Sequence, residues 1–308
     1  MLDALTLDQM RTFVAVAEAG SFRAGAARLL RVQSAVSHAV ANLEAQLGVT
    51  LFDRSGHRPE LTAEGRSLLV DVRAILLKVD ALRARAQGLA EGIELGLAIA
   101  VDTLFPPAVA AAALKELHEV YPSVSVRVIY ASLGGTIAAL RERHCVLAVT
   151  AFERSDPQIA MEALMPLSMT AVVSPAHPLA ATASKRKRIS TVELADHLQI
   201  VVEDPSSLTE GQDFGVLSPS TWRVSDMQTK HALILAGVGW GSLPSWMAEE
   251  DLAGGRLVRV AAAELGAMGE TPSRAYLAHR TDHALGLAAQ RLSLALRKQA
   301  AEYRKRRK

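Results

Sequence analysis

Short polar side chains gather on one side of a helix predicted over about residues 33–47. The apolar residues Ala35, Val36, Val40, Leu43 and Leu47 are expected to point inward. The polar side chains on the other side are Gln33, Ser34, Ser37, His38 and Asn42. Side chains of this kind hydrogen-bond base edges and phosphates in the DNA major groove, which admits a helix, whereas a solvated helix face would usually carry Glu and Lys. The pattern therefore predicts a helix that contacts DNA bases.

Two shorter helices precede this one and position it. Thr6 and Gln9 form a predicted capping box for a helix that ends at Gly20, and Ser21 is placed to cap a second helix that runs to about residue 30. After residue 48, strands are expected at 51–52 and 60–62, with a turn between them. This order of elements predicts a winged helix-turn-helix.

Other interpretations of the same residues stay open. Ser21 and Ser34 are suited to cap helices, Asn42 to stabilise its own helix, and Arg54 to hold the wing through an ion pair. A role for the whole helix in reading DNA does not depend on any one of them.

The first sixty or so residues resemble a known protein family. The segments FVAVAEAGSFRAGAARL, QSAVSHAVANLE, LGVTLFDR and LTAEG, in this order and spacing, resemble the LysR-type transcriptional regulators. The resemblance implies that the polar residues of the third helix lie in the groove and that Arg31 and Arg54 lie near phosphates. Ser21 and Arg23 complete the predicted DNA-binding set. RVQSAVS departs from the family, in which many members have a hydrophobic residue and serine ahead of the glutamine.

A long helix is predicted after residue 62, over about 63–90. Its apolar residues alternate in steps of four and three, a heptad pattern that favours packing against a partner helix, with an amphipathic core helix as the alternative. Two-fold dimers present paired recognition helices to successive major grooves. The predicted dimerisation residues are Leu68, Val72, Ile75, Val79, Leu82 and Leu89.

The remainder of the chain reads as α/β. Strands at 94–101, 124–130 and 145–150, with helices starting near 105–107 and 134, predict a parallel sheet. A second group follows, with strands at 169–173, 198–202 and 222–224 and helices near 190 and 228–236. A strand at 275–279 and a helix from about 283 end the chain. The resemblance implies two Rossmann-like subdomains like those of type 2 periplasmic binding proteins.

The predicted domains follow from these patterns. Residues 1–62 form the DNA-binding domain, 63–90 the linker and dimerisation helix, and 91–308 the effector-binding domain. Within the last, subdomain I spans about 91–163 and 267–303, and subdomain II about 164–266. The periodicity of the long helix breaks at residues 88–92.

The resemblance implies that an effector binds between these subdomains, where strands end and helices begin. The segments VDTLFP, ASLGG and IVVED match the family's cleft positions, with an N-cap as the alternative role of Thr103. The predicted effector-binding residues are Thr103, Leu104, Ser132, Leu133, Thr150, Val202 and Glu203. Where relatives often have a glycine and an aspartate, this chain has Arg143 and Val146.

Two further features have structural interpretations. The segment GVGWGSLP lacks the lysine and serine or threonine of a phosphate-binding loop, so it predicts helix termination and close backbone packing. Cys145, the only cysteine, is expected to be a small buried hydrophobe.

Composition narrows the class of protein. Hydrophobic residues make up 50% and charged residues 21%, and the net charge is +2, as expected for a globular protein. HExxH, GxSxG and GxGxxG motifs are absent from the sequence, so we expect neither an enzyme nor a bound cofactor. A lack of long apolar runs and of a signal segment predicts a cytoplasmic protein.

These observations predict a regulator that binds double-stranded DNA at an interrupted palindrome. Its other predicted partners are a small-molecule effector of the metabolite class and a second copy of itself in a dimer or tetramer. RNA polymerase is a further candidate partner, and no membrane is involved. The alternatives are a solute-binding protein, which leaves the N-terminal helices unexplained, and an architectural DNA-binding protein, which has no need of an α/β sensor.

Overall fold

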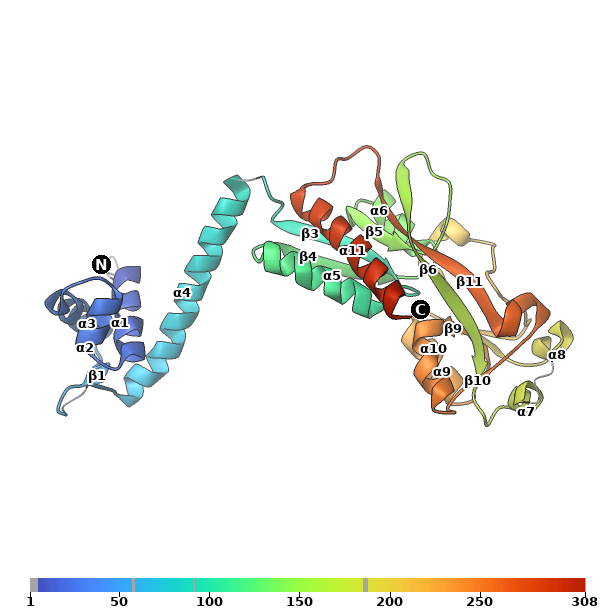
Figure 1. The fold of residues 1–308 in the computed structure, drawn as a ribbon, viewed down its shortest axis with the longest axis horizontal. Helices are drawn as coiled ribbons and strands as arrows, with labels where there is room; N and C mark the ends of the chain where they lie inside the picture. Colours follow the sequence, from blue (N-terminus) through green and yellow to red (C-terminus); the bar gives the residue numbers. More distant parts are fainter. Residues whose placement is uncertain (1–4, 57–58, 91, 185–187, 308) are drawn as a thin grey trace. The chain divides into compact units, whose positions relative to one another are not determined.

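The computed structural model describes residues 5–56, 59–90, 92–184 and 188–307, and Figure 1 shows its fold. The chain divides into two compact units, Met1–Gln87 and Gly88–Lys308. Each unit has hydrophobic clusters of its own, so each is described by itself.

The first unit begins with three helices, α1 (Leu7–Ala19), α2 (Phe22–Arg28) and α3 (Gln33–Leu47). The capping box of α1 is confirmed, because the Thr6 hydroxyl accepts the Gln9 N–H and the Gln9 side chain accepts the Thr6 N–H. The Ser21 hydroxyl accepts the Ala24 N–H at 3.1 Å, so the predicted cap of α2 is confirmed as well. The predicted bounds of these helices are correct to within about two residues.

The three helices pack around a small aromatic core. The Phe52 ring stands edge-on to Phe13 and Phe22, with centroids 5.6 and 5.3 Å apart. Val36 and Val40 bury the inner side of α3 as predicted. Ala35 is exposed, so its predicted inward position is wrong: it precedes Val36 by one residue, and one residue turns a helix by about 100°.

The wing and the long helix meet at Thr62. Strand β1 (Phe52–Asp53) pairs antiparallel with β2 (Glu60–Leu61), and α4 (Ala63–Ala90) follows directly. The Thr62 hydroxyl donates to the Thr50 carbonyl oxygen and accepts the Gly65 N–H at 2.8 Å. A Cβ atom on Gly65 would lie 2.2 Å from the Leu51 carbonyl oxygen. The segment LTAEG therefore joins wing and helix through a cap and a close backbone approach.

The apolar stripe of α4 is partly packed into the core of the first unit and partly exposed. Val72 is buried and Leu68 half-buried, and both pack into the core of the first unit, which favours the core-helix alternative for this part of the stripe. Ile75 and Leu82 are exposed, and Val79 is half-buried. The side chain of Leu89 and the residue Glu91 lie outside the described part of the chain.

The second unit contains the predicted parallel sheet. Strand β3 (Gly96–Asp102) lies between β4 (Ser125–Ala131) and β5 (Leu147–Thr150) and is parallel to both. The crossover helices are α5 (Pro107–Val120) and α6 (Gly135–Arg141). Helices α5 and α11 (Leu287–Arg306) lie side by side in Figure 1, and both pack on the Leu97, Ile99 and Val101 side of β3. Helix α6 covers the opposite side.

Two long antiparallel strands run from this lobe into a second one. Strand β11 (Glu270–Arg280) pairs along its whole length with residues 159–170 of β6 (Ile159–Val173). The predicted strands at 169–173 and 275–279 are only parts of these strands. Ala275 pairs with Met165 and Tyr276 with Ala163, so the register shifts at that point. This β-bulge lies where the predicted subdomains exchange.

The second lobe surrounds the other half of β6. Strands β9 (Gly241–Pro244) and β10 (Val258–Arg259) pair with β6, and β7 (Gln199–Val202) pairs parallel with β8 (Thr221–Val224). β9 and β10 were not predicted. The helices of this lobe are α7 (Pro178–Ser184), α8 (Thr191–Ala195), α9 (Met227–Leu235) and α10 (Ser245–Ala253), with short 3₁₀ turns at Ser207–Thr209, Ala263–Leu265 and Ala267–Gly269.

The glycine-rich segment before β9 packs closely against β7, as predicted. A Cβ atom on Gly239 would lie 2.4 Å from the Leu198 carbonyl oxygen, and one on Gly241 would lie 2.7 Å from that of Ile200. Between them, Trp240 is fully buried. Within the described residues, none of the helices is long and apolar enough to cross a membrane.

Candidate functional site

The outer side of α3 presents the predicted polar residues together. Gln33, Ser34, His38 and Asn42 are exposed, and Ser37 is half-buried. Asn42 Nδ2 lies 3.1 Å from His38 Nδ1, so these two side chains also stabilise one another along the helix. Ser34 is not the cap of α3, because the residue at the N-cap is Val32. Ser34 is therefore available for other hydrogen bonds.

The arginines near this surface hold surface ion pairs. Arg31 Nη1 lies 2.7 Å from Asp8 Oδ2, and its hydrogen bond lowers the pKa of that carboxyl. Arg54 pairs with Glu44 at 3.1 Å, and its guanidinium lies 4.7 Å from the centre of the Phe22 ring. Arg23 is exposed and, among the described residues, has no ion pair. The ion-pair alternative for Arg54 is thus present in the structure.

Glu44 positions the wing against α3. Besides Arg54, its carboxylate accepts the N–H groups of Leu51 and Phe52 at 2.8 and 3.1 Å. Sequence reasoning missed this role. The available signal was an acidic residue beside the inward-facing Leu43, seven residues before Leu51, the first residue whose N–H it accepts.

A cavity of about 460 Å³ opens between the two lobes of the second unit, and we call it the cleft cavity. Thr103 and Ser132 line it, with their hydroxyl oxygens 2.8 Å apart. It is lined by five of the seven predicted effector-binding residues, namely Thr103, Leu104, Ser132, Leu133 and Val202. The structure thus brings together segments that lie about a hundred residues apart.

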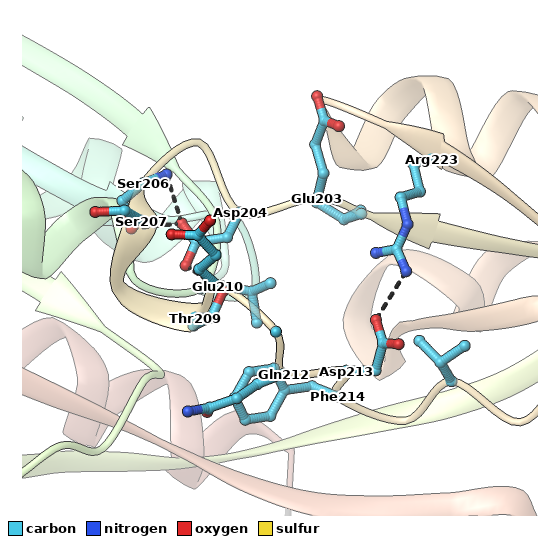
Figure 2. Close-up of a pocket in the computed structure, with 14 residues that line it drawn as sticks. Glu203, Asp204, Ser206, Ser207, Thr209, Glu210, Gln212, Asp213, Phe214 and Arg223 are labelled. Carbon is cyan, nitrogen blue, oxygen red and sulfur yellow. Dashed lines mark hydrogen bonds and ion pairs between the residues drawn. The ribbon is translucent and has the colours of Figure 1, made fainter.

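Thr150 and Glu203 lie outside the cleft cavity, which corrects their predicted position. Thr150 is fully buried below it, where its hydroxyl accepts hydrogen bonds from the Thr136 hydroxyl and the Phe152 N–H. Glu203 lines an adjoining outer pocket of about 620 Å³, drawn in Figure 2. Neighbouring residues of an extended segment point to opposite sides, so Val202 and Glu203 do not share all of their surroundings.

The two units match two descriptions of known protein families. Residues 7–66 match the bacterial regulatory helix-turn-helix protein, lysR family, and residues 90–301 match the LysR substrate binding domain. The chain belongs to the LysR family of transcriptional regulators. It is therefore a DNA-binding regulator with an effector-binding domain.

Relatives and solved structures agree with this family. The chain is 33% identical over 257 residues to the probable HTH-type transcriptional regulator YhaJ of Escherichia coli (strain K12). The alignment covers 82% of this chain and 85% of YhaJ. It is 32% identical to the uncharacterized regulator YeeY of the same strain, over 82% of each chain. The crystal structure of ArgP from Mycobacterium tuberculosis shares the fold, with a TM-score of 0.52, 24% identity and 98% coverage of both chains.

Two positions depart from the residues that resemble the LysR pattern. Val32 stands at the N-cap of α3 in the place of the usual serine, and no side-chain hydrogen bond caps the helix. Arg143, in the place of a glycine, has φ of 61°, in the left-handed region. The backbone of the LysR-type fold is therefore kept at both positions without the residue best suited to it.

Asp102 is a cleft residue that sequence reasoning missed. It lines the cleft cavity but is almost fully buried, and its carboxylate accepts the N–H groups of Leu104 and Ala151 at 2.9 and 3.1 Å. Burial raises the pKa of Asp102 to about 6, although both hydrogen bonds act in the opposite direction. An acidic residue directly before the predicted VDTLFP cleft threonine was the available signal.

Asp204 joins the two lobes at the edge of the cleft. Its carboxylate accepts the Gly134 N–H from the first lobe at 3.0 Å, and it also accepts hydrogen bonds from Ser206 and Thr209 in its own loop (Figure 2). A Cβ atom on Gly134 would lie 2.6 Å from Asp204 Oδ2. The loop after β7 is therefore fitted to a glycine at the start of α6.

Aromatic side chains also bridge the lobes. Phe152, after β5, stands edge-on to Phe214 of the second lobe with centroids 5.8 Å apart, and both rings line the cleft cavity. The Trp246 indole N–H donates to the Leu104 carbonyl oxygen at 2.8 Å. These contacts place a mostly apolar, two-sided cavity inside the effector-binding domain.

Proposed function

We propose that this LysR-type regulator reads an interrupted palindromic operator as a homodimer, with α3 of each copy in the major groove. The observation that supports the proposal is the polar, mostly exposed side of α3. Gln33, Ser34 and Ser37 lie near the start of the helix, where a recognition helix contacts base edges. His38 and Asn42 extend this surface by one turn.

Phosphate contacts are assigned to Arg23, Arg31 and Arg54, with Ser21 beside them. Arg31 and Arg54 are about half exposed in their ion pairs with Asp8 and Glu44. The Arg31–Asp8 pair is exposed on both sides and contributes only about 0–1 kcal/mol, so exchanging this carboxylate for a phosphate costs little. Arg23 has no ion pair among the described residues, so it can contact a phosphate without giving up a partner.

Self-association is assigned to the exposed part of the α4 stripe. Leu82 is 66% exposed and Ile75 40% exposed, on a helix whose preceding turns are already packed. Burying such side chains against a second copy removes apolar surface from water. A dimer, or a tetramer built from dimers, follows.

The second unit is assigned as the sensor, with the effector in the cleft cavity. Effector binding shifts the protein between arrangements only if it favours one of them. Cys145 is buried, and burial raises its pKa to about 11, which opposes a thiolate redox sensor. We propose that the protein acts by binding and not by catalysis, and that it does so in the cytoplasm. RNA polymerase at the promoter is a further proposed partner.

An electrophoretic mobility shift with DNA that flanks the protein's own gene tests the DNA-binding assignment. The double variant Ser34→Ala/Ser37→Ala should weaken specific binding by about 10- to 100-fold. Gln46→Ala, exposed at the far end of the same helix, is the matched control and should bind as the parent does. If the double variant binds as tightly as the control, α3 is not the reader.

A further inference from the structure

The walls of the cleft cavity are largely apolar. Leu104, Leu133, Met169, Val202 and Met227 contribute aliphatic and thioether surface from both lobes. Phe214 is 50% exposed although it faces Phe152 across the cavity. An exposed aromatic ring beside a cavity of about 460 Å³ is available to a small ligand, since ligand sites usually have volumes of about 300–1,000 Å³.

The charged side chains that line this cavity are all of one sign. Asp102, Glu153 and Glu264 line it, and among its described lining residues none is a lysine, arginine or histidine. Glu153 accepts a hydrogen bond from the Tyr276 hydroxyl and Glu264 one from the Thr191 hydroxyl. Both of these partners are neutral hydroxyl groups, so neither hydrogen bond pairs the carboxylate with a cation.

The outer pocket adds more negative charge. It shares Leu133, Val202 and Phe214 with the cleft cavity, and its acidic lining residues are Glu203, Asp204, Glu210 and Asp213. Its one cation among the described lining residues is Arg223, which points at Asp213 in Figure 2 and bonds it at 2.8 Å. The arginine is therefore already paired, and a ligand meets a negative field from both sides.

This arrangement discriminates between ligand charges. A carboxylate would lose its hydration in the cavity, find no cation among the described lining residues and be repelled by the carboxylates. An ammonium group would be attracted by the same carboxylates and by the faces of Phe152 and Phe214. The apolar walls favour a ligand whose remaining part is a hydrocarbon, whichever charged group it carries.

We infer that the effector is an apolar or aromatic amine that binds in the cleft cavity as its cation. This inference rests on the proposed role of the cavity as the sensor site. The hydroxyl oxygens of Thr103 and Ser132 line the cavity and can accept hydrogen bonds from the ligand's ammonium group.

The test uses compounds that differ only in the polar group. The full chain is titrated by calorimetry and thermal shift with an amine, an alcohol and a carboxylate on each of three frameworks, phenyl, naphthyl and cyclohexyl; benzylamine, benzyl alcohol and benzoate form the first set. The best amine should bind at least about tenfold more tightly than its carboxylate. A carboxylate that binds more tightly than its amine, or a panel in which no amine binds, overturns the inference.

Two variants locate the binding. Phe214→Ala should weaken the best amine by about tenfold, whereas Trp222→Ala, a half-exposed aromatic outside the cavity, should leave it unchanged. Equal effects of the two substitutions would place the amine elsewhere and reject the inference. Retention of operator DNA by the same preparation separates the two failures: loss of DNA binding rejects the proposed function, and intact DNA binding with a preferred carboxylate rejects only the amine.

Discussion

The two units of the chain differ in whether they bury charged side chains. In the first unit the ion pairs Arg31–Asp8, Arg54–Glu44 and Arg73–Glu18 lie at the surface, and its buried polar residues, among those described, are the uncharged Gln9 and Thr12. In the second unit Asp102 and Lys230 are almost fully buried. Among the described residues both units carry ion pairs at the surface, but only the second unit also encloses charged side chains.

The difference follows from what each unit binds. DNA phosphates are met at an exposed surface, where a charged side chain exchanges one partner for another at little cost. A small ligand is met inside a cavity, where buried charge affects both ligand choice and stability. Asp102 lines the cleft cavity, and Lys230 lies one turn after the cavity residue Met227 on α9. We therefore expect buried charge to lower the free energy of unfolding of the second unit and not that of the first.

The largest expected effect is on Lys230. Its ammonium group has no hydrogen bond or ion pair among the described residues, and burial lowers the pKa of Lys230 to about 8. A shift of this size from 10.5 corresponds to about 3 kcal/mol, at 1.36 kcal/mol per pH unit. Lys230→Met should therefore stabilise the second unit by up to about 3 kcal/mol at neutral pH. All three tryptophans lie in this unit, so urea unfolding followed by tryptophan fluorescence measures it.

The pH dependence has a definite sign. Below pH 8 the lysine is protonated in both states and the folded state carries the full cost; from about pH 8 to 10.5 the unfolded chain holds the extra proton, so the parent gains stability as the pH rises. The advantage of Lys230→Met should shrink over this window. Lys115→Met, on an exposed lysine, is the control. An advantage that does not change with pH would show that apolar packing, and not charge, is responsible.

The next largest effect concerns backbone packing in the first unit. A methyl group at Gly65 would meet the Leu51 carbonyl oxygen at 2.2 Å, so Gly65→Ala should destabilise this unit by about 2–3 kcal/mol. Hydrogen exchange of peptides from α1 and α3 measures the loss, while tryptophan fluorescence of the second unit should not change. The control is Gly96→Ala, at which the added atom meets nothing within 4 Å. A first unit that tolerates Gly65→Ala would contradict the tight joint between wing and α4.

The sequence predicted the first unit well because its elements are local. Thr6, Ser21 and Gly20 each act within one helix turn of where they stand, and the α3 stripe follows from helix periodicity. The division of the α4 stripe was not predictable in this way. Val72 faces a core made by residues far earlier in the chain, and a heptad pattern does not distinguish that core from a partner helix.

The cleft was predicted only in part because it is assembled from distant segments. Thr103, Ser132 and Val202 were found through resemblance, and they do meet. Phe214 stands in a loop without periodicity, and the first half of β6 carries Glu162 and Pro166, which obscure a strand pattern. The burial of Asp102 depends on the N–H groups of Leu104 and Ala151, which come from separate strand ends. Only tertiary structure supplies this information.

A smaller effect is expected at the start of α3. Val32 has the extended backbone of an N-cap but no side-chain acceptor, so Val32→Ser should stabilise the first unit by about 1 kcal/mol. Hydrogen exchange of α3 peptides measures the gain. Leu30→Ser, at a still more exposed position two residues earlier, adds no cap and is the control. A gain shared by both variants would reflect the removal of exposed apolar surface and not capping.

The smallest effect is expected at Arg143, where the second unit keeps a left-handed residue without a glycine. The strain of a non-glycine residue at φ of 61° is about 1–2 kcal/mol, and the greater freedom of glycine in the unfolded chain offsets about half of it. Its ion pair with Asp282, at 3.6 Å and exposed, adds little. Arg143→Gly should therefore stabilise this unit by about 0.5 kcal/mol, read by tryptophan fluorescence. Glu142→Gly, at a neighbouring residue with φ of −79°, should instead destabilise it, because only the entropic cost remains. If both substitutions lower stability equally, the left-handed backbone at Arg143 carries no strain.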